Sequence, residues 1–250
     1  MKKVIVFDMD KTLGYFTQLG VLIEAIEEIR KKSIKRTDLY KIFDLYPECF
    51  RPGIFKTLKY IKKNKKKENM KVLIYTNNIG PKKWAYDIKN YLEYKLGSKL
   101  FDKVITAWKV EGKVYEKCRT THYKIYKDLL ICGKLDKKDK ILFFDDTFFE
   151  DLASREQVTF IYNSAYKLDL DFKTMNKRFL KSKIKHLLKD KSTLLLDVLN
   201  DSGYKPSIRN CEYKSNEFID KVKLFILKNK VKKTRKQKRK RKRNNKSKKK

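Results

Sequence analysis

Short apolar runs alternate with longer segments in which apolar residues recur every three or four positions, over about the first 165 residues. The runs are typical of strands that are buried on both faces, and the recurring positions are typical of amphipathic helices. The expected strands cover residues 4–7, 72–75, 104–106, 141–144 and 158–162. Strands that alternate with helices predict an α/β fold with helices on both faces of a parallel sheet.

Helices are expected between these strands. The first carries one apolar stripe made of Leu19, Leu22, Ile26 and Ile29. The other expected elements are a helix after Arg51-Pro52-Gly53, a helix after Pro81, a weak hairpin over 108–115 and a helix over 121–131.

The pattern divides the chain into three parts. Residues 1–166 form the predicted α/β domain. Residues 167–228 show helical spacing and many lysines but no clear strand, so we expect a helical extension that packs on the core. Residues 229–250 are almost wholly basic and polar, which predicts a disordered tail.

The positive charge is spread along the chain. The formal net charge is +35, and from Lys228 to the end there are 16 Lys or Arg residues and no acid. The first 227 residues therefore carry about +19 (35 less 16), so the body is basic too. Such charge favours polyanionic partners, including nucleic acid bound through the tail. The tail is also typical of a nuclear localisation signal, and a merely solubilising tail is the simpler alternative.

The cysteines and the absence of long apolar runs indicate a location. We see no signal peptide and no apolar run long enough to cross a membrane. The four cysteines, at 49, 118, 132 and 211, form no CxxC pair, which argues against a zinc ribbon or a disulfide framework. We therefore expect a soluble intracellular protein in a reducing compartment, with no membrane partner.

Three of the expected strands end in polar residues. The strand ends read Asp8-Met9-Asp10-Lys11-Thr12, Thr76-Asn77-Asn78 and Asp145-Asp146-Thr147. In an open parallel sheet, ligands bind just beyond the carboxyl ends of the strands. The sequence therefore predicts that these three groups meet at one edge. An isolated Asp or Thr at a strand end is commonly a helix cap, but Asp-x-Asp-x-Thr after a buried strand is far more specific.

Four crowded carboxylates repel one another, and a divalent cation offsets that repulsion. A ligand set made only of oxygen favours Mg²⁺ over Zn²⁺, with Asp8, Asp10, Asp145 and Asp146 as the expected metal site. A carboxylate can attack phosphorus, and a second carboxyl two residues later can move the proton. A threonine hydroxyl and a lysine would neutralise the remaining phosphate charge.

The motifs Asp8–Leu13, Thr76 and Asp145-Asp146 resemble those of the haloacid dehalogenase (HAD) phosphatase superfamily. The resemblance covers roughly residues 1–165 and implies a HAD-like Rossmannoid sheet. It implies that Asp8 is the nucleophile and Asp10 the acid/base. It also implies that Mg²⁺ contacts the Asp8 carboxylate, the Asp10 carbonyl and the acidic pair.

Within the superfamily, the chain most resembles the NLI-interacting-factor-like branch, the phosphatases of the RNA polymerase carboxy-terminal domain. Arg51-Pro52-Gly53 and the segment 122–130 carry this resemblance. It implies a phosphoserine or phosphothreonine protein as the substrate, with Thr76, Asn77 and Lys124 binding phosphate. Asn77 and Asn78 depart from the branch, which usually has a small residue and Ser there, and residues 14–50 match nothing in it.

The third-motif lysine has three candidates. Lys124 is preferred because it is expected in the opening turn of a helix, near the strand ends. Lys127 is second, one turn further on, and Lys109 is third.

Two other functions and one open structural question remain at this stage. A phosphatase of nucleic-acid ends suits the same fold and the basic surface. A non-catalytic binding scaffold is disfavoured because it has no need of an acid/base such as Asp10. Trp84 and Trp108 are better explained by packing, with a groove-lining role as the alternative.

Overall fold

The computed structural model describes residues 1–208 and 213–228. Its centre is a sheet with the strand order β3-β2-β1-β6-β7, in which every pairing is parallel. The strands are β1 (Lys3–Phe7), β2 (Met70–Tyr75), β3 (Lys103–Ile105), β6 (Lys140–Asp145) and β7 (Val158–Tyr162). The predicted α/β class with a parallel sheet is confirmed, and every expected strand is present.

Strand β1 is the middle of the sheet and is buried along its whole length. It pairs with β2 and β6, so that Phe7 lies opposite both Ile74 and Phe144. Because these strands run in the same direction and in this register, the residues that follow them reach one edge of the sheet. We call this edge the acidic rim; it carries Asp8, Asp10, Thr76, Asp145 and Asp146.

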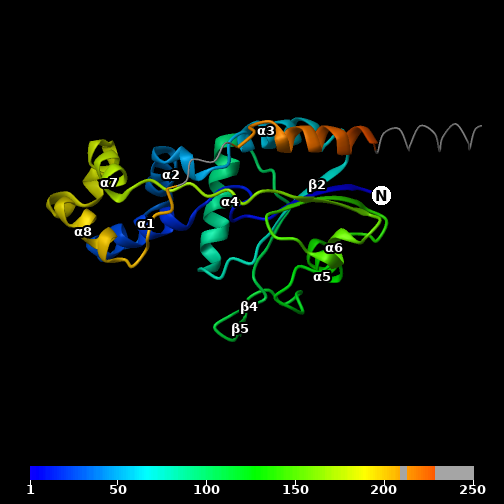
Figure 1. Cartoon of the computed structure of the whole chain (residues 1–250), viewed down its shortest axis with the longest axis horizontal. Helices are drawn as coiled ribbons and strands as arrows, with labels where there is room; N and C mark the ends of the chain where they lie inside the picture. Colours follow the sequence, from blue (N-terminus) through cyan, green and yellow to red (C-terminus); the bar gives the residue numbers. More distant parts are fainter. Residues whose placement is uncertain (209–212, 229–250) are drawn as a thin grey trace, which may run out of the picture.

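Alternate side chains of the sheet enter two separate cores. Ile5 and Phe7 join a core that includes residues of α3 (Ile54–Lys65) and α4 (Lys82–Leu96). Val4 and Val6 join a core that includes residues of α5 (Tyr126–Gly133) and α6 (Glu150–Ala153). Figure 1 shows α3 on one side of the strands and α5 and α6 on the other. Helices therefore cover both faces of the sheet, as expected.

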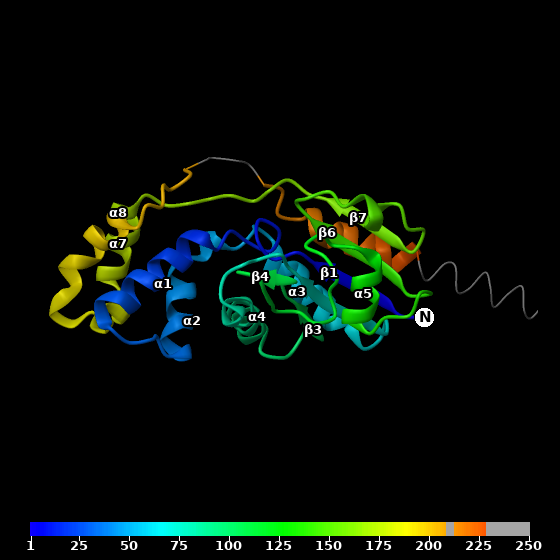
Figure 2. The same cartoon turned by 90° about the horizontal axis from the view of Figure 1, so that it is seen from below.

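A second group of helices lies beyond the sheet, at the left of Figures 1 and 2. We call it the helical lobe; it comprises α1 (Thr17–Arg30), α2 (Arg36–Leu45), α7 (Phe172–Lys181), α8 (Leu194–Asp201), η2 (Lys183–Leu187) and η3 (Lys189–Thr193). The predicted apolar stripe of α1 is buried, and α8 packs against α1. Two parts of the chain that are distant in sequence therefore build this lobe together.

Polar contacts join the two halves of the helical lobe. Tyr46 donates its hydroxyl hydrogen to the carbonyl of Met175 at 2.9 Å. The guanidinium of Arg178 meets the carboxylate of Glu48, in the short helix η1 (Pro47–Cys49), at 2.8 Å. These contacts fix α7 against the segment that leads back toward the sheet.

The loops on the other side of the sheet hold one confirmed and one corrected element. The predicted hairpin is present as β4 (Lys109–Val110) and β5 (Lys113–Val114), with positive φ angles at Glu111 and Gly112. The helix expected over 121–131 is wrong at its start, because α5 begins at Tyr126. Lys124 therefore precedes the helix and does not lie in its first turn.

The cysteines also require a correction. Cys118 and Cys132 form a disulfide, contrary to the expectation of unpaired cysteines that the absence of a CxxC pair had suggested. The chain turns back between them, so α5 returns close to the segment that precedes Lys124. Cys49 is buried and free, and Cys211 lies outside the described residues.

The C-terminal part adds to the core of the sheet. A helix over 217–228 brings Phe218 onto Phe144, with ring centroids 4.5 Å apart, and near Phe7 at 6.3 Å. The prediction of disorder over 229–250 falls outside the described residues. Across the two described ranges, no helix has the combined length and apolar character that spanning a bilayer requires.

Candidate active site

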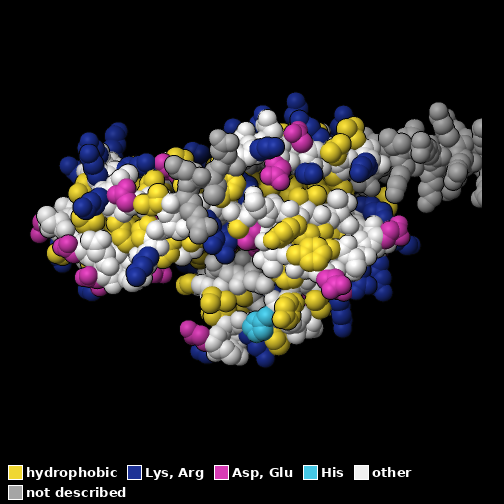
Figure 3. All heavy atoms as spheres, in the orientation of Figure 1, with side chains coloured by type: hydrophobic (Ala, Val, Ile, Leu, Met, Phe, Trp, Pro, Cys, Tyr) yellow, Lys and Arg dark blue, Asp and Glu magenta, His cyan; other side chains and the backbone are white. Residues whose placement is uncertain are grey.

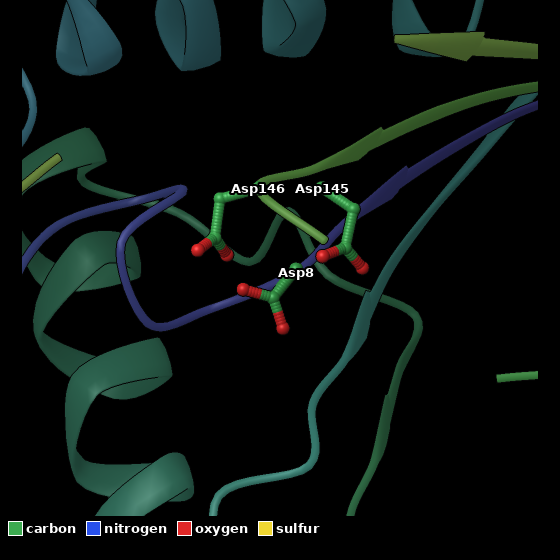
Figure 4. A group of neighbouring side chains, drawn as sticks. All are labelled: Asp8, Asp145 and Asp146. Atoms are coloured by element: carbon green, nitrogen blue, oxygen red, sulfur yellow. The ribbon is translucent and has the colours of Figure 1, made fainter. Parts of the chain in front are cut away.

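Three carboxylates converge at the acidic rim. Asp8, Asp145 and Asp146 each place a carboxylate oxygen within 4.8 Å of the others (Figure 4). Asp8 follows β1, Asp145 is the last residue of β6, and Asp146 follows it. Asp8 and Asp145 are buried and Asp146 is partly exposed. The parallel register of β1 and β6 is therefore the direct cause of this cluster.

Lys124 lies between two of these acids. Its Nζ is 2.6 Å from Asp8 Oδ1 and 2.7 Å from Asp145 Oδ2, and the side chain is only 2% exposed. Burial alone would lower the pKa of this ammonium, but the two carboxylates outweigh burial and raise it. Lys124 therefore stays charged, as a fixed cation within the cluster.

The other two lysine candidates lie elsewhere. Lys127 is exposed in the first turn of α5. Lys109 lies over the ring of Trp108, 4.2 Å from its centre, in the hairpin. Among the three candidates, Lys124 alone contacts the acids, although the helical position that favoured it was wrong.

Arg119 holds the segment that carries Lys124. This buried guanidinium donates to the carbonyls of Thr106 at 2.9 Å and Thr76 at 3.3 Å. It also donates to three successive carbonyls, those of Thr121, His122 and Tyr123. It thereby ties the turn before Lys124 to the ends of β2 and β3. Nothing in the sequence marked Arg119, because its partners are backbone atoms brought together by the fold.

Asp10 lies beside the cluster with a partner of its own. Asn78 Nδ2 donates to Asp10 Oδ2 at 2.8 Å. Burial and the nearby charge of Asp8 raise the pKa of Asp10 to about 6, although Asn78 opposes the shift. Asn78 is itself held in place. Its side-chain oxygen accepts from Gly80 N at 2.9 Å, and its backbone N–H donates to Thr76 Oγ1 at 3.0 Å. The sequence analysis noted Asn78 only as a departure from the related branch.

The remaining predicted site residues differ in position. Thr76 is buried at the end of β2, where its N–H donates to Ile105 O at 2.9 Å. Asn77, by contrast, is exposed, and within the described residues no hydrogen bond joins it to any of the four acids. Thr76 is joined to the site through Asn78, which donates to the Thr76 hydroxyl and to Asp10, whereas the side chain of Asn77 has no such link among the described residues.

Arg51 supports the loop that follows Asp8. Its guanidinium donates to the carbonyls of Lys11 and Thr12, each at 2.7 Å. Lys11 has a φ of 58°, and its N–H donates to Gly14 O at 2.6 Å, so the loop turns sharply after Asp10. The Arg-Pro-Gly segment thus has a structural function in this chain.

The acidic rim fits a magnesium ion. Lys124 is the only cation in direct contact with its carboxylates in the described part of the chain, and it cannot neutralise three of them. Asp8, Asp145 and Asp146 offer the oxygen ligands that Mg²⁺ prefers. The Asp10 carboxylate, expected as a fourth member, lies outside this cluster and accepts a hydrogen bond from Asn78.

Comparison with known proteins gives little similarity. No protein-family model and no curated protein matches this chain. Among solved structures, it is similar to one described as a β-phosphoglucomutase from Thermotoga maritima. The identity is 15%, the match covers 80% of this chain and 99% of the other, and the TM-score is 0.35. So low a score carries no conclusion about function, which must come from the side chains of the site.

Proposed function

We propose that this chain is a magnesium-dependent phosphomonoester hydrolase of the HAD superfamily that forms an aspartyl-phosphate on Asp8. One observation carries the proposal: Lys124 is buried between Asp8 and Asp145, with Asp146 beside them. A buried ion pair is costly to desolvate and is poor evidence of a purely stabilising role. Buried clusters of charged groups with shifted pKa values are typical of active sites.

The first step transfers the phosphoryl group to Asp8. A carboxylate oxygen of Asp8 attacks phosphorus as the bond from phosphorus to the leaving oxygen breaks. Asp10 gives its proton to that oxygen, so the product leaves as an alcohol. A pKa of about 6 makes Asp10 a suitable donor near neutral pH. Lys124 neutralises negative charge that the phosphate brings to the buried carboxylates.

The second step releases phosphate. Asp10, now a carboxylate, accepts a proton from water, and the water oxygen attacks phosphorus. The bond between phosphorus and the Asp8 oxygen breaks, which frees inorganic phosphate and restores Asp8. Asn78 keeps the Asp10 carboxyl in place during both proton transfers.

Asp8, Asp145 and Asp146 would hold the magnesium ion, with the Asp10 carbonyl as the further ligand that the resemblance implies. When bound, Mg²⁺ supplies positive charge that lets an anionic nucleophile approach a phosphate dianion.

The substrate expected from the resemblance is a phosphoserine or phosphothreonine protein of the polymerase carboxy-terminal-domain type. The basic body supports it, because cationic side chains bind multiply phosphorylated peptides. Arg51 does not add support for a phosphopeptide substrate. Its guanidinium already donates to backbone carbonyls of the loop that follows Asp8. The basic tail remains a proposed contact for nucleic acid.

The test is phosphate release by the full chain with Mg²⁺ from p-nitrophenyl phosphate, a phosphoserine peptide and an end-phosphorylated oligonucleotide. We expect release from p-nitrophenyl phosphate, and its loss in Asp8→Asn. The matched control is Asp220→Asn, which removes an exposed acid whose one ion pair among the described residues is with Lys223. Equal activity in the two variants would refute the proposed function.

A further inference from the structure

A cavity of about 410 Å³ adjoins the acid/base residue. It runs from Asp10 and Asn78 between α1 and α4 toward the start of α2. Its volume is in the range of sites for small organic ligands, which are typically several hundred Å³. A substrate whose phosphate reaches Asp8 must place its leaving group near Asp10, so this cavity is where the leaving group would lie.

One face of α1 forms a wall of this cavity. Thr17, Gly20, Glu24 and Glu27 line it at helical spacing. A rise of 1.5 Å per residue puts Glu24 about 10 Å and Glu27 about 15 Å along the helix from Thr17. A ligand that extends from Asp10 along α1 therefore meets apolar surface first and carboxylates afterwards.

The apolar part of the lining comes from several elements. Trp84 of α4, Leu39 of α2 and Phe16 contribute to it. Trp84 stacks on Phe43, with ring centroids 5.8 Å apart, so its ring is held in place. Trp84 therefore has both of the roles that its sequence position allowed, packing and groove lining.

The charge of the cavity is opposite to that of the chain. Among the described residues that line it, Lys83 is the only basic one, and its Nζ forms an ion pair with the Asp87 carboxylate at 2.5 Å. The carboxylate of Glu24 is exposed and has no ion pair or hydrogen bond to any described residue. The carboxylate of Glu27 accepts from the backbone N–H of Ile34 at 2.7 Å and has no other described partner. The far part of the cavity thus keeps two carboxylates that no cation of residues 1–208 or 213–228 pairs with.

The acidic lining of this cavity favours a substrate other than the phosphoprotein that the resemblance implies. We infer that the preferred substrate is a small phosphomonoester whose alcohol part has an apolar or aromatic body and ends in a cationic amine. This inference rests on the proposed function and names the substrate class for that same site. The amine would pair with Glu24 and Glu27, while the apolar body fills the space beside Trp84. A polynucleotide end would bring further negative charge to these carboxylates, which opposes its binding.

The experiment compares three aryl phosphates that differ at one end. They are 4-(2-aminoethyl)phenyl phosphate, its neutral analogue 4-propylphenyl phosphate, and the anionic 3-(4-phosphonooxyphenyl)propanoate. Because all three release a simple phenol, differences in kcat/KM report recognition of the far end and not leaving-group chemistry. For the full chain with Mg²⁺, we expect the amine to exceed the neutral analogue about tenfold and the acid to be the poorest.

Two variants locate the effect. Glu24→Gln and Glu27→Gln should each reduce the ratio of kcat/KM for the amine over the neutral analogue severalfold. The matched control is Glu28→Gln, on the same helix but exposed and outside the cavity lining, which should keep the ratio. Gly20→Leu should impair all three substrates, since a β-carbon there has only Trp84 within 4.0 Å and a longer side chain would enter the cavity.

The outcomes separate the two proposals. Hydrolysis of all three substrates with no preference for the amine, or a preference that Glu24→Gln and Glu27→Gln leave intact, overturns the substrate class but not the hydrolase. No hydrolysis of these substrates or of p-nitrophenyl phosphate overturns the proposed function and this inference with it. A phosphoserine peptide with an adjacent lysine that outperforms the amine, and depends on Glu24, shows instead that the cavity binds a peptide side chain.

Discussion

The acidic rim and the helical lobe are built by different means. The rim depends on buried charges with fixed partners, such as Lys124 between Asp8 and Asp145, and it stands on the central strands of the sheet. The lobe depends mainly on apolar contacts between helices distant in the sequence, with a few polar contacts such as that of Tyr46 with Met175, and its helix α1 lines one wall of the cavity beside the site. Under the proposed function, the sheet would carry the chemistry and the lobe would select the substrate.

Charge shows the same contrast. On the face in Figure 3, Lys and Arg side chains occur over both the helical lobe and the sheet. The cavity between α1 and α4 nevertheless has more acids than bases. The net charge of a chain therefore says little about the sign of the charge inside a particular cavity.

Removal of magnesium should have the largest effect, because it acts on the rim alone. Excess chelator should abolish phosphate release from p-nitrophenyl phosphate, since three clustered carboxylates would then face the phosphate with only Lys124 to offset them. Independently of activity, saturating Mg²⁺ should stabilise the folded wild type by about 2–4 kcal/mol in thermal unfolding. Asp145→Asn should reduce that stabilisation. Full activity in chelator would show that the rim has been misread.

Loss of the buried lysine should have the next largest effect. Lys124→Met should reduce kcat for p-nitrophenyl phosphate about 1000-fold, by analogy with the loss of a single charge-stabilising donor. It should also destabilise the magnesium-free protein by about 3–5 kcal/mol, because Asp8 and Asp145 lose their shared cation.

The control for this prediction is Lys127→Met, three residues further along the chain. Lys127 is exposed, so we expect kcat within about twofold and stability within about 0.5 kcal/mol of the wild type. Turnover and denaturant unfolding of both variants check it. Similar losses of turnover in both variants would contradict the assignment of Lys124.

A change inside the lobe should have the smallest effect on the chemistry. Leu199 on α8 is fully buried, and Leu199→Ala should lower the free energy of unfolding by about 2–4 kcal/mol. Turnover of p-nitrophenyl phosphate under folding conditions should stay within about twofold, because Leu199 lines neither the rim nor the cavity. Chemical denaturation and steady-state kinetics on the same preparation measure both quantities. A large fall in kcat for the folded variant would mean that lobe and rim are not separable.

Much of the rim could be predicted from the sequence because strand order does not affect which ends of parallel strands meet. Any parallel arrangement of the runs before Asp8, Thr76 and Asp145 places these residues at one edge. The sheet could be predicted because the apolar runs are short and rich in Val, Ile and Phe, as is typical of strands buried on both faces.

The remaining features depend on contacts that leave no local pattern. Arg119 binds backbone carbonyls at the ends of two strands and in a turn. In the sequence it is one of many basic residues, so nothing distinguishes it. The disulfide between Cys118 and Cys132 requires the turn between them to be known. The partner of α1 is α8, which a single sequence cannot reveal. The acids of the cavity were likewise indistinguishable from ordinary exposed residues of α1.

The measurement that tests the central claim most directly is chemical trapping of the phosphoryl group on Asp8. Asp10→Asn lacks the base for the second step, and an aryl phosphate has a leaving group that needs little help from an acid, so the intermediate should accumulate in this variant. After acid quenching, borohydride reduction should convert the phosphorylated aspartate at position 8 to homoserine. Mass spectrometry then detects this change. The account predicts homoserine at position 8 of Asp10→Asn only when substrate is present. It predicts no homoserine there when Asp8→Asn is added to this variant. Reduction at another carboxylate, or phosphate release with no trapped species at Asp8, would contradict it.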